Sequence, residues 1–187
     1  VKDTRLAIQQ WAKTIVAKQG LRVVGITGSV GKTTAKEAVA AVLGSERTVF
    51  KNRANYNGLY GLPIALGELR PEHKLAVLEM AADHFGEVAR LCEIAPPRIG
   101  VVTTVEPAHL ETFGSLDAIA LEKSALVAAL PPDGVAVLNA DDPRVAAMTP
   151  LTRAAVLTFG TTRAEAGRPC PDVCASQIIP SREGVDF

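Results

Sequence analysis

The sequence predicts a doubly wound α/β domain with a mostly parallel sheet and a phosphate-binding loop. A glycine-rich stretch joins a short apolar run to a helical segment, which is the order strand, loop, helix. Further apolar runs of strand length alternate with helical segments along the chain. Strands that are apolar throughout are typical of parallel sheets covered by helices on both faces, and ligands bind such sheets beyond the carboxyl ends of the strands.

The first elements follow from apolar spacing and from helix-ending residues. Residues 1–19 are expected to form an amphipathic helix, because apolar residues recur at helical spacing from Ile8 and Asp3 or Thr4 can cap it. A strand at 21–24 leads into the glycine loop, and a helix at 35–43 follows it and ends at Gly44. The remaining expected segments are strands at 48–50 and 74–80, a helix at 85–94, a strand at 98–104, a helix at 115–130 capped by Ser115, and strands at 134–139, 154–159 and 173–179, with a polar loop at 51–61.

Composition excludes several classes of protein. A chain of 187 residues that is 48% hydrophobic can bury a full core in one domain. Its formal net charge is zero, so nothing indicates a nucleic-acid partner or an anionic membrane surface, and no apolar run is long enough to insert in a membrane. Cys92, Cys170 and Cys174 complete no metal-ligand spacing, which favours reduced thiols in a cytoplasmic protein.

The glycine loop, residues 27–34, predicts a nucleotide site. Its glycines allow backbone N–H groups to converge on one anion, and the following helix start adds donors and a positive dipole end. Lys32 is expected to reach the outer phosphates, and the Thr33 hydroxyl is expected to bind Mg²⁺. The spacing departs from the general pattern, because Ile26 stands five positions before Gly31 where glycine is usual.

Polar residues follow three of the other predicted strands. Glu79 ends an apolar strand, where it is placed either to hold Mg²⁺ beside Thr33 or to face solvent as a strand terminus. His109 lies in the loop after a later strand, as a capping or a site residue. Asn139 and Asp142 can bind the adenine or ribose of a nucleotide, or can form an ordinary turn.

Two further features have ordinary explanations when they are judged from the residues alone. Lys123 is expected to be a solvated residue of its helix. The asparagines of the loop at 51–61, including Asn55 and Asn57, are typical of a turn-rich connection.

Four stretches, in this order, resemble motifs of the central ATP-binding domain of the Mur ligases. They are residues 27–34, the pair Glu79-Met80, residues 108–115 and residues 139–143. The resemblance covers nearly the whole chain. It implies a linker helix at 1–20 and the central ATP-binding domain at 21–187, with the end of that domain and the family's N- and C-terminal domains missing from this sequence.

The resemblance also implies roles for individual residues. Thr33 and Glu79 would hold one Mg²⁺ (or Mn²⁺) with the phosphates of ATP. Glu79, His109 and Lys123 would serve a second metal, with Lys123 carbamylated so that it offers oxygen ligands. Asn55 and Asn57 would lie near the acceptor substrate. The residues implied in nucleotide binding are Gly28, Ser29, Val30, Gly31, Lys32, Thr33, Thr34, Asn139 and Asp142, and those implied in catalysis are Lys32, Glu79, His109 and Lys123.

The form of the motifs is most similar to the family members that join D-alanyl-D-alanine to UDP-N-acetylmuramoyl-tripeptide. This implies a cytoplasmic, monomeric, ATP-dependent amide ligase of peptidoglycan precursor synthesis that works through an acyl phosphate. Departures at Ala54, Gly58, Ala81 and Glu106 bear on the substrate contacts more than on the ATP site. The alternatives are another ligase of the superfamily, of the folylpolyglutamate or cyanophycin synthetase type, and an ATP-binding module without ligase chemistry.

Overall fold

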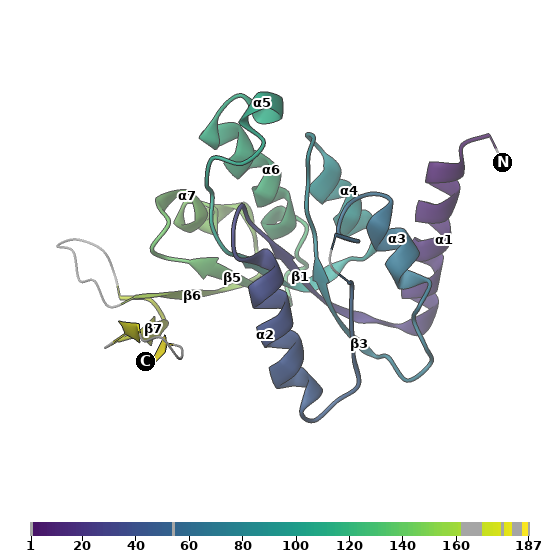
Figure 1. Ribbon diagram of the computed structural model, residues 1–187, viewed down its shortest axis with the longest axis horizontal. Coiled ribbons are helices and arrows are strands. Elements are labelled where there is room, and N and C mark those ends of the chain that lie inside the picture. Colours follow the sequence, from purple (N-terminus) through teal and green to yellow (C-terminus); the bar gives the residue numbers. More distant parts are fainter. Residues whose placement is uncertain (1, 54, 162–169, 177, 181–184, 187) are drawn as a thin grey trace.

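A sheet of seven parallel strands forms the centre of the molecule (Figure 1). The computed structural model describes residues 2–53, 55–161, 170–176, 178–180 and 185–186. The strand order is β2-β3-β1-β4-β5-β6-β7, so β1 lies between β3 and β4 at the middle of the sheet. The strands are β1 (Arg22–Thr27), β2 (Val49–Lys51), β3 (Leu75–Glu79), β4 (Pro97–Val102), β5 (Val135–Asn139), β6 (Ala155–Thr161) and β7 (Val173–Ala175), and a separate antiparallel pair consists of β8 (Ile179–Pro180) and β9 (Val185–Asp186).

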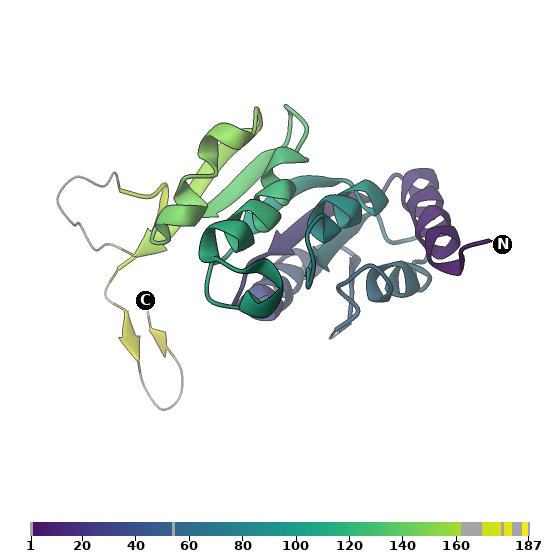
Figure 2. The same ribbon diagram turned by 90° about the horizontal axis from the view of Figure 1, so that it is seen from above.

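The helices connect these strands. They are α1 (Thr4–Gln19), α2 (Lys32–Gly44), α3 (Gly61–Leu66), α4 (Glu87–Ile94), α5 (Leu110–Phe113), α6 (Leu116–Ala128) and α7 (Pro143–Ala146), with a 3₁₀ turn at Thr149–Leu151. Helix α1 and strands β6 and β7 lie at opposite ends of the molecule (Figure 2). The predicted α/β fold with a parallel sheet is confirmed.

Several boundaries agree with the sequence-based predictions and several differ. Asp3 caps α1 and Ser115 caps α6, each by accepting hydrogen bonds from backbone N–H groups of the first turn. Strand β1 continues to Thr27, beyond the predicted end at residue 24, because β3 and β4 pair with it on both sides. The short helices α3, α5 and α7 were not predicted, since one or two turns give too few residues for a periodic pattern.

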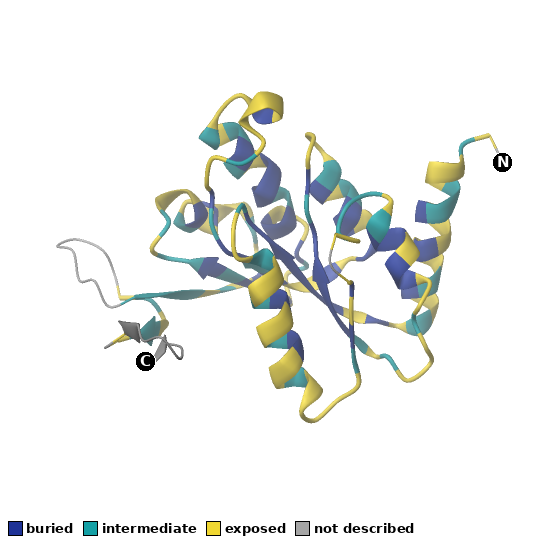
Figure 3. Cartoon of the chain, viewed as in Figure 1, coloured by how far each residue is buried: buried dark blue, intermediate teal, exposed yellow. Residues whose placement is uncertain are grey.

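The two faces of the sheet are covered unequally. Helices α1, α3, α4, α6 and α7 supply residues to one large core, which is buried against the inner strands (Figure 3). On the other face α2 packs on β1, β2 and β3. Farther along that face, Ile99 and Leu157 are 36% and 39% exposed. The expected cover on both faces is therefore incomplete over β4 to β6 within the described part of the chain.

The cysteine and membrane predictions can be compared with the structure. All three cysteines are free thiols, and the Sγ atoms of Cys170 and Cys174 lie 3.7 Å apart. No helix in the described residues has both the length and the apolar character needed to cross a membrane.

Candidate functional site

The glycine loop at residues 28–31 leaves the end of β1 and turns directly into α2. Gly28 has a φ of 146°, and a Cβ atom there would lie 1.9 Å from the Thr103 Oγ1 atom, so a larger residue cannot replace it. Gly31 has a φ of 84° immediately before the helix begins. These two glycines allow the backbone to turn between the sheet and the helix in the space that the end of β4 leaves.

Residues after β4 hold the loop in place. The Ser29 N–H donates to the Thr104 carbonyl at 2.8 Å, and the Val30 N–H donates to Thr104 Oγ1 at 3.2 Å. The Thr103 hydroxyl donates to the Val30 carbonyl at 2.6 Å. The N–H groups of Ser29 and Val30 are therefore engaged within the protein, and the N–H groups at the start of α2, which have no partner within the helix, are the ones placed to receive an anion.

Lys32 folds back over this loop. Its Nζ atom donates to the carbonyls of Gly28 and Ser29 at 2.8 and 2.9 Å. Burial lowers the pKa of Lys32, and the nearby carboxylates of Glu79 and Asp83 oppose that change. Because burial disfavours the charged form of this half-buried amine, an anionic partner at the mouth of the loop would stabilise it.

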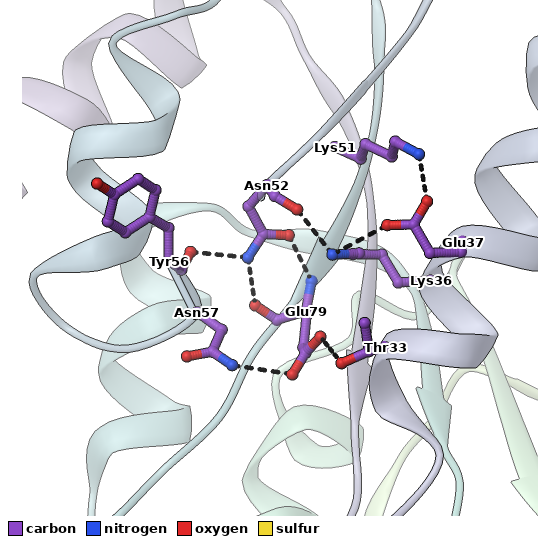
Figure 4. A network of polar contacts seen from close by, with 8 residues as sticks. All are labelled: Thr33, Lys36, Glu37, Lys51, Asn52, Tyr56, Asn57 and Glu79. Carbon is purple, nitrogen blue, oxygen red and sulfur yellow. Dashed lines mark hydrogen bonds and ion pairs between the residues drawn. The ribbon is translucent and has the colours of Figure 1, made fainter. Parts of the chain in front are cut away.

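Glu79 meets the start of α2 and the asparagine-containing loop (Figure 4). It is 2% exposed at the end of β3. The Thr33 hydroxyl donates to Glu79 Oε2 at 2.8 Å, and the Asn57 side-chain amide donates to Glu79 Oε1 at 2.8 Å. The structure therefore brings Thr33 and Glu79 together, as the sequence predicted, and it places Asn57 on the same carboxylate.

Asn52 and Lys36 belong to the same polar network and were not predicted. Both are completely buried. The Asn52 side chain exchanges two hydrogen bonds with the backbone of Glu79, and Lys36 Nζ donates to the Asn52 carbonyl at 2.8 Å. A signal was available for Lys36, which lies three residues after Thr33 and so on the same face of the helix.

Lys123 is buried in α6, and the prediction from the residues alone that it is solvated was wrong. It is 6% exposed. The pKa of Lys123 falls to about 8, first because of burial and then because of the Lys32 charge, while Glu122 opposes the change. Lys32 is therefore close enough for its charge to affect Lys123.

His109 is separate from this group. It immediately precedes α5 and has a left-handed φ of 54°; its side chain is exposed, and its Nε2 atom lies 3.5 Å from Asp83 Oδ1. The described residues contain no direct contact between His109 and Glu79, and no group of three or more His, Cys, Asp or Glu side chains that could hold a metal. Asp83, which also acts on Lys32, was missed because it lies four residues after the end of the strand, in the irregular segment before α4.

Asn139 and Asp142 make the contacts of a structured turn at the end of β5. Asn139 donates to the Thr103 carbonyl at 2.8 Å and accepts from the Asp141 N–H. Asp142 caps α7 through the N–H groups of Arg144 and Val145 and also accepts from the Val105 N–H. These contacts account for the Asp142 carboxylate without a nucleotide. Among the described residues, the second amide hydrogen of Asn139 has no hydrogen-bond partner. Asn55 is exposed in the loop before α3.

Comparisons with known proteins agree with the fold and with the order of these motifs. Residues 26–187 match the model of the Mur ligase middle domain. The chain is 46% identical over 142 residues to the UDP-N-acetylmuramoyl-tripeptide--D-alanyl-D-alanine ligase of Synechocystis, covering 76% of this chain and 31% of that protein. It thus spans about a third of the length of that curated relative.

Solved structures give the same result. A crystal structure of MurF from Acinetobacter baumannii superimposes with a TM-score of 0.86 at 31% identity, over 100% of this chain and 42% of that one. MurF ligase from Thermotoga maritima, solved in complex with ADP, superimposes with a TM-score of 0.80 at 37% identity, over 86% of this chain and 37% of that one.

Proposed function

Because this chain belongs to the Mur ligase family, in the region of the middle domain, we propose that it is the nucleotide-binding part of an ATP-dependent amide ligase. The proposed reaction joins D-alanyl-D-alanine to UDP-N-acetylmuramoyl-tripeptide in the cytoplasm, as a step in making peptidoglycan precursors. The name of the Synechocystis relative supports this choice of substrates. The observation in the molecule that carries the proposal is the contact between Thr33 and Glu79 beside the glycine loop.

The start of α2 is the proposed phosphate site. The N–H groups from Gly31 to Thr34 would bind the phosphates of ATP, with Gly28, Ser29 and Val30 shaping the loop around them. Lys32 would exchange its two loop carbonyls for the outer phosphates. A charged phosphate oxygen is the stronger partner for an ammonium group, so this exchange is favourable.

Thr33 and Glu79 fit a magnesium ion by their chemistry. Mg²⁺ prefers hard oxygen ligands and is commonly held by one or two protein groups together with substrate phosphates. The Thr33 hydroxyl and the Glu79 carboxylate place such oxygens 2.8 Å apart, next to the phosphate site. When bound, the ion would neutralise charge on the phosphates and so favour phosphoryl transfer.

Lys123, His109 and Glu79 are the proposed residues for a second metal. CO₂ adds to a neutral amine, and the lowered pKa of Lys123 increases the neutral fraction near neutral pH. Carbamylation would convert this lysine into an anion with oxygen ligands. His109 is paired with Asp83 in the structure, so it must leave that pair in order to join Glu79.

The remaining proposals concern the adenine of ATP, the acceptor substrate and the two steps of the reaction. Asn139 would use its free amide hydrogen to contact adenine, and the loop with Asn55 and Asn57 would face the acceptor. The terminal carboxylate of the tripeptide attacks the γ-phosphorus of ATP, giving an acyl phosphate and ADP. The amine of the dipeptide then attacks the acyl carbon, forms the amide and releases phosphate.

The test is substrate-dependent release of ADP by the intact natural protein that contains this chain. ADP release that requires both UDP-N-acetylmuramoyl-tripeptide and D-alanyl-D-alanine, with formation of the pentapeptide product, is the expected result. Folate with glutamate, and the substrates of cyanophycin synthesis, serve as controls for the other ligases of the superfamily. ATP binding without ADP release on any of these substrates would instead favour a binding module.

A further inference from the structure

Asn52 holds the backbone of Glu79 at the place where strand pairing stops. The parallel pairing of β2 with β3 ends at Lys51 and Val77, two residues before Glu79. Beyond it, the Asn52 side chain accepts from the Glu79 N–H at 2.9 Å and donates to the Glu79 carbonyl at 3.0 Å (Figure 4). A side-chain amide thus replaces the missing strand neighbour and fixes the backbone that carries the carboxylate.

The same asparagine uses both of its amide hydrogens. Its second amide hydrogen is donated to the Tyr56 carbonyl at 2.8 Å, so the side chain also fixes the start of the following loop. A buried amide with every donor satisfied resists rotation, because any other rotamer leaves polar atoms unpaired. The position of Glu79 is therefore determined by a group that itself has a single favourable orientation.

Lys36 connects Asn52, and through it the backbone of Glu79, to the helix that carries Thr33. Its Nζ atom donates to the Asn52 carbonyl at 2.8 Å and lies 3.3 Å from Glu37 Oε1. Thr33 and Lys36 lie three residues apart on one face of α2. Helix α2 consequently contacts the end of β3 at two points, directly through Thr33 and indirectly through Lys36 and Asn52.

A lysine in this position needs an explanation, because it has no exposed surface. Burying an amine is unfavourable unless it is well hydrogen bonded, and an apolar side chain of similar volume would fill the same space without that cost. The polar contact has a geometric consequence that an apolar one lacks, since a hydrogen bond fixes both distance and direction.

We propose that Lys36 and Asn52 are positioning residues that align the Glu79 carboxylate with the Thr33 hydroxyl for a common magnesium ion. They act through the backbone of Glu79 and through the orientation of α2, and neither is assigned a contact with ATP. The inference rests on the proposed function, since it concerns the magnesium that would accompany ATP. Outer partners of metal ligands commonly contribute tenfold or more to metal affinity, so removing them has a measurable effect.

The experiment compares ATP binding with Mg²⁺ and with EDTA, by calorimetry on the intact natural protein that contains this chain. The variants are Lys36→Met and Asn52→Leu, which keep the volume and remove the polar groups. Lys51→Met is the matched control, because Lys51 is an exposed lysine next to Asn52 that pairs with Glu37 on the outside of the network.

We expect the gain in ATP affinity that Mg²⁺ provides to fall about tenfold in Lys36→Met and Asn52→Leu, while affinity in EDTA changes by less than about twofold. Lys51→Met should keep the gain of the wild type. A purely structural role would lower the unfolding temperature, or weaken ATP binding equally in both buffers, and would leave the gain unchanged.

The outcomes separate the inference from the function on which it rests. If the wild type binds ATP but shows no gain with Mg²⁺, the proposed magnesium site is wrong and the inference fails with it; if it does not bind ATP in either buffer, the proposed nucleotide site is wrong. If the wild type shows the gain and Lys36→Met retains it in full, the inference alone is wrong. Lys36→Met tests the inference even if Asn52→Leu does not fold, because it keeps both hydrogen bonds between the Asn52 side chain and the Glu79 backbone.

Discussion

Lys32 shows how a binding residue can be engaged before its ligand arrives. Its amine satisfies two carbonyls of its own loop and does not pack in the apolar core. Exchanging these hydrogen bonds for bonds to a phosphate costs little free energy, because the amine is hydrogen bonded both before and after the exchange.

The substitution Lys32→Ala should therefore weaken ATP binding with little effect on the fold. The lost charged hydrogen bonds correspond to about 1.5–3 kcal/mol, or roughly 10- to 150-fold in affinity. Calorimetric titration with ATP and Mg²⁺ measures the change, and circular dichroism checks that the chain is folded. The exposed Lys13→Ala in α1 is the control. Unchanged ATP affinity in Lys32→Ala would contradict the assignment of the glycine loop.

Lys123 should make folding stability depend on pH. Its pKa is about 8 in the folded chain and 10.5 for the unperturbed group, so the unfolded chain binds more protons between these values. The free energy of unfolding therefore rises with pH across that interval. The cost of burying the charged Lys123 amine, about 3 kcal/mol, is fully present below pH 8.

Lys123→Met removes this penalty and should be more stable than the wild type near pH 7 in buffer free of CO₂. The difference should narrow as the pH approaches 10. Urea unfolding at several pH values measures it, and a difference that is constant with pH would show that the amine is not perturbed. With ¹³C-labelled bicarbonate, a carbamate carbon signal that is absent from Lys123→Met would support the proposed modification.

At the scale of elements, α6 holds α4 in place through one carboxylate. Helix α4 starts at Gly86 without a side-chain cap of its own. Glu122 of α6 accepts from the N–H groups of Gly86 and Val88 at 2.6 and 2.7 Å, and it is 4% exposed. A carboxylate at a helix start satisfies the free donors there and interacts favourably with the helix dipole.

Glu122→Gln should lower the free energy of unfolding by about 1–3 kcal/mol, because the amide group can accept only one of the two bonds. Glu93→Gln is the matched control, since Glu93 is exposed on α4 and its loss should change stability by less than about 0.5 kcal/mol. Urea denaturation of both variants measures the difference. Equal stabilities would mean that the contact with α4 contributes nothing.

At the scale of the whole molecule, the described residues contain the nucleotide half of the proposed reaction. The glycine loop and Glu79 lie at the carboxyl edge of the sheet, and Lys123 lies near Lys32 of that loop. In the Synechocystis relative, the matched region is 31% of the protein, so about two thirds of its residues lie outside that region. Amide formation needs the carboxylate, the γ-phosphate and the amine to be aligned, and such alignment can be equivalent to an effective concentration of roughly 10⁵ M or more.

A protein limited to these 187 residues should therefore bind ATP weakly and form no measurable amide. Closure around an acyl phosphate also excludes water, which would otherwise hydrolyse it. A coupled assay for ADP, run beside chromatography of the product, measures both quantities. Turnover to the pentapeptide by this chain alone would show that the residues outside it are dispensable.

The sequence by itself predicted the fold class and the glycine loop, and it offered a place for Glu79 beside Thr33 as one of two interpretations. These features follow from local rules: apolar strands, glycines before a helix, and carboxyl ends of parallel strands that share one edge. The assignment of the domains, and of every nucleotide-binding, metal-binding, substrate and catalytic role, stays a prediction.

Only the tertiary structure decided which helical polar residues are buried. Glu122 and Lys123 lie in a helix whose sequence gives no reason to separate them from solvated residues, and the spacing of Lys36 from Thr33 indicates a shared helix face but not the element that buries it. Burial on a helix depends on which distant element packs against each face, and that element is chosen by the arrangement of the whole sheet. The network around Glu79 and the lowered pKa of Lys123 therefore arise from contacts between segments that the chain brings together only on folding.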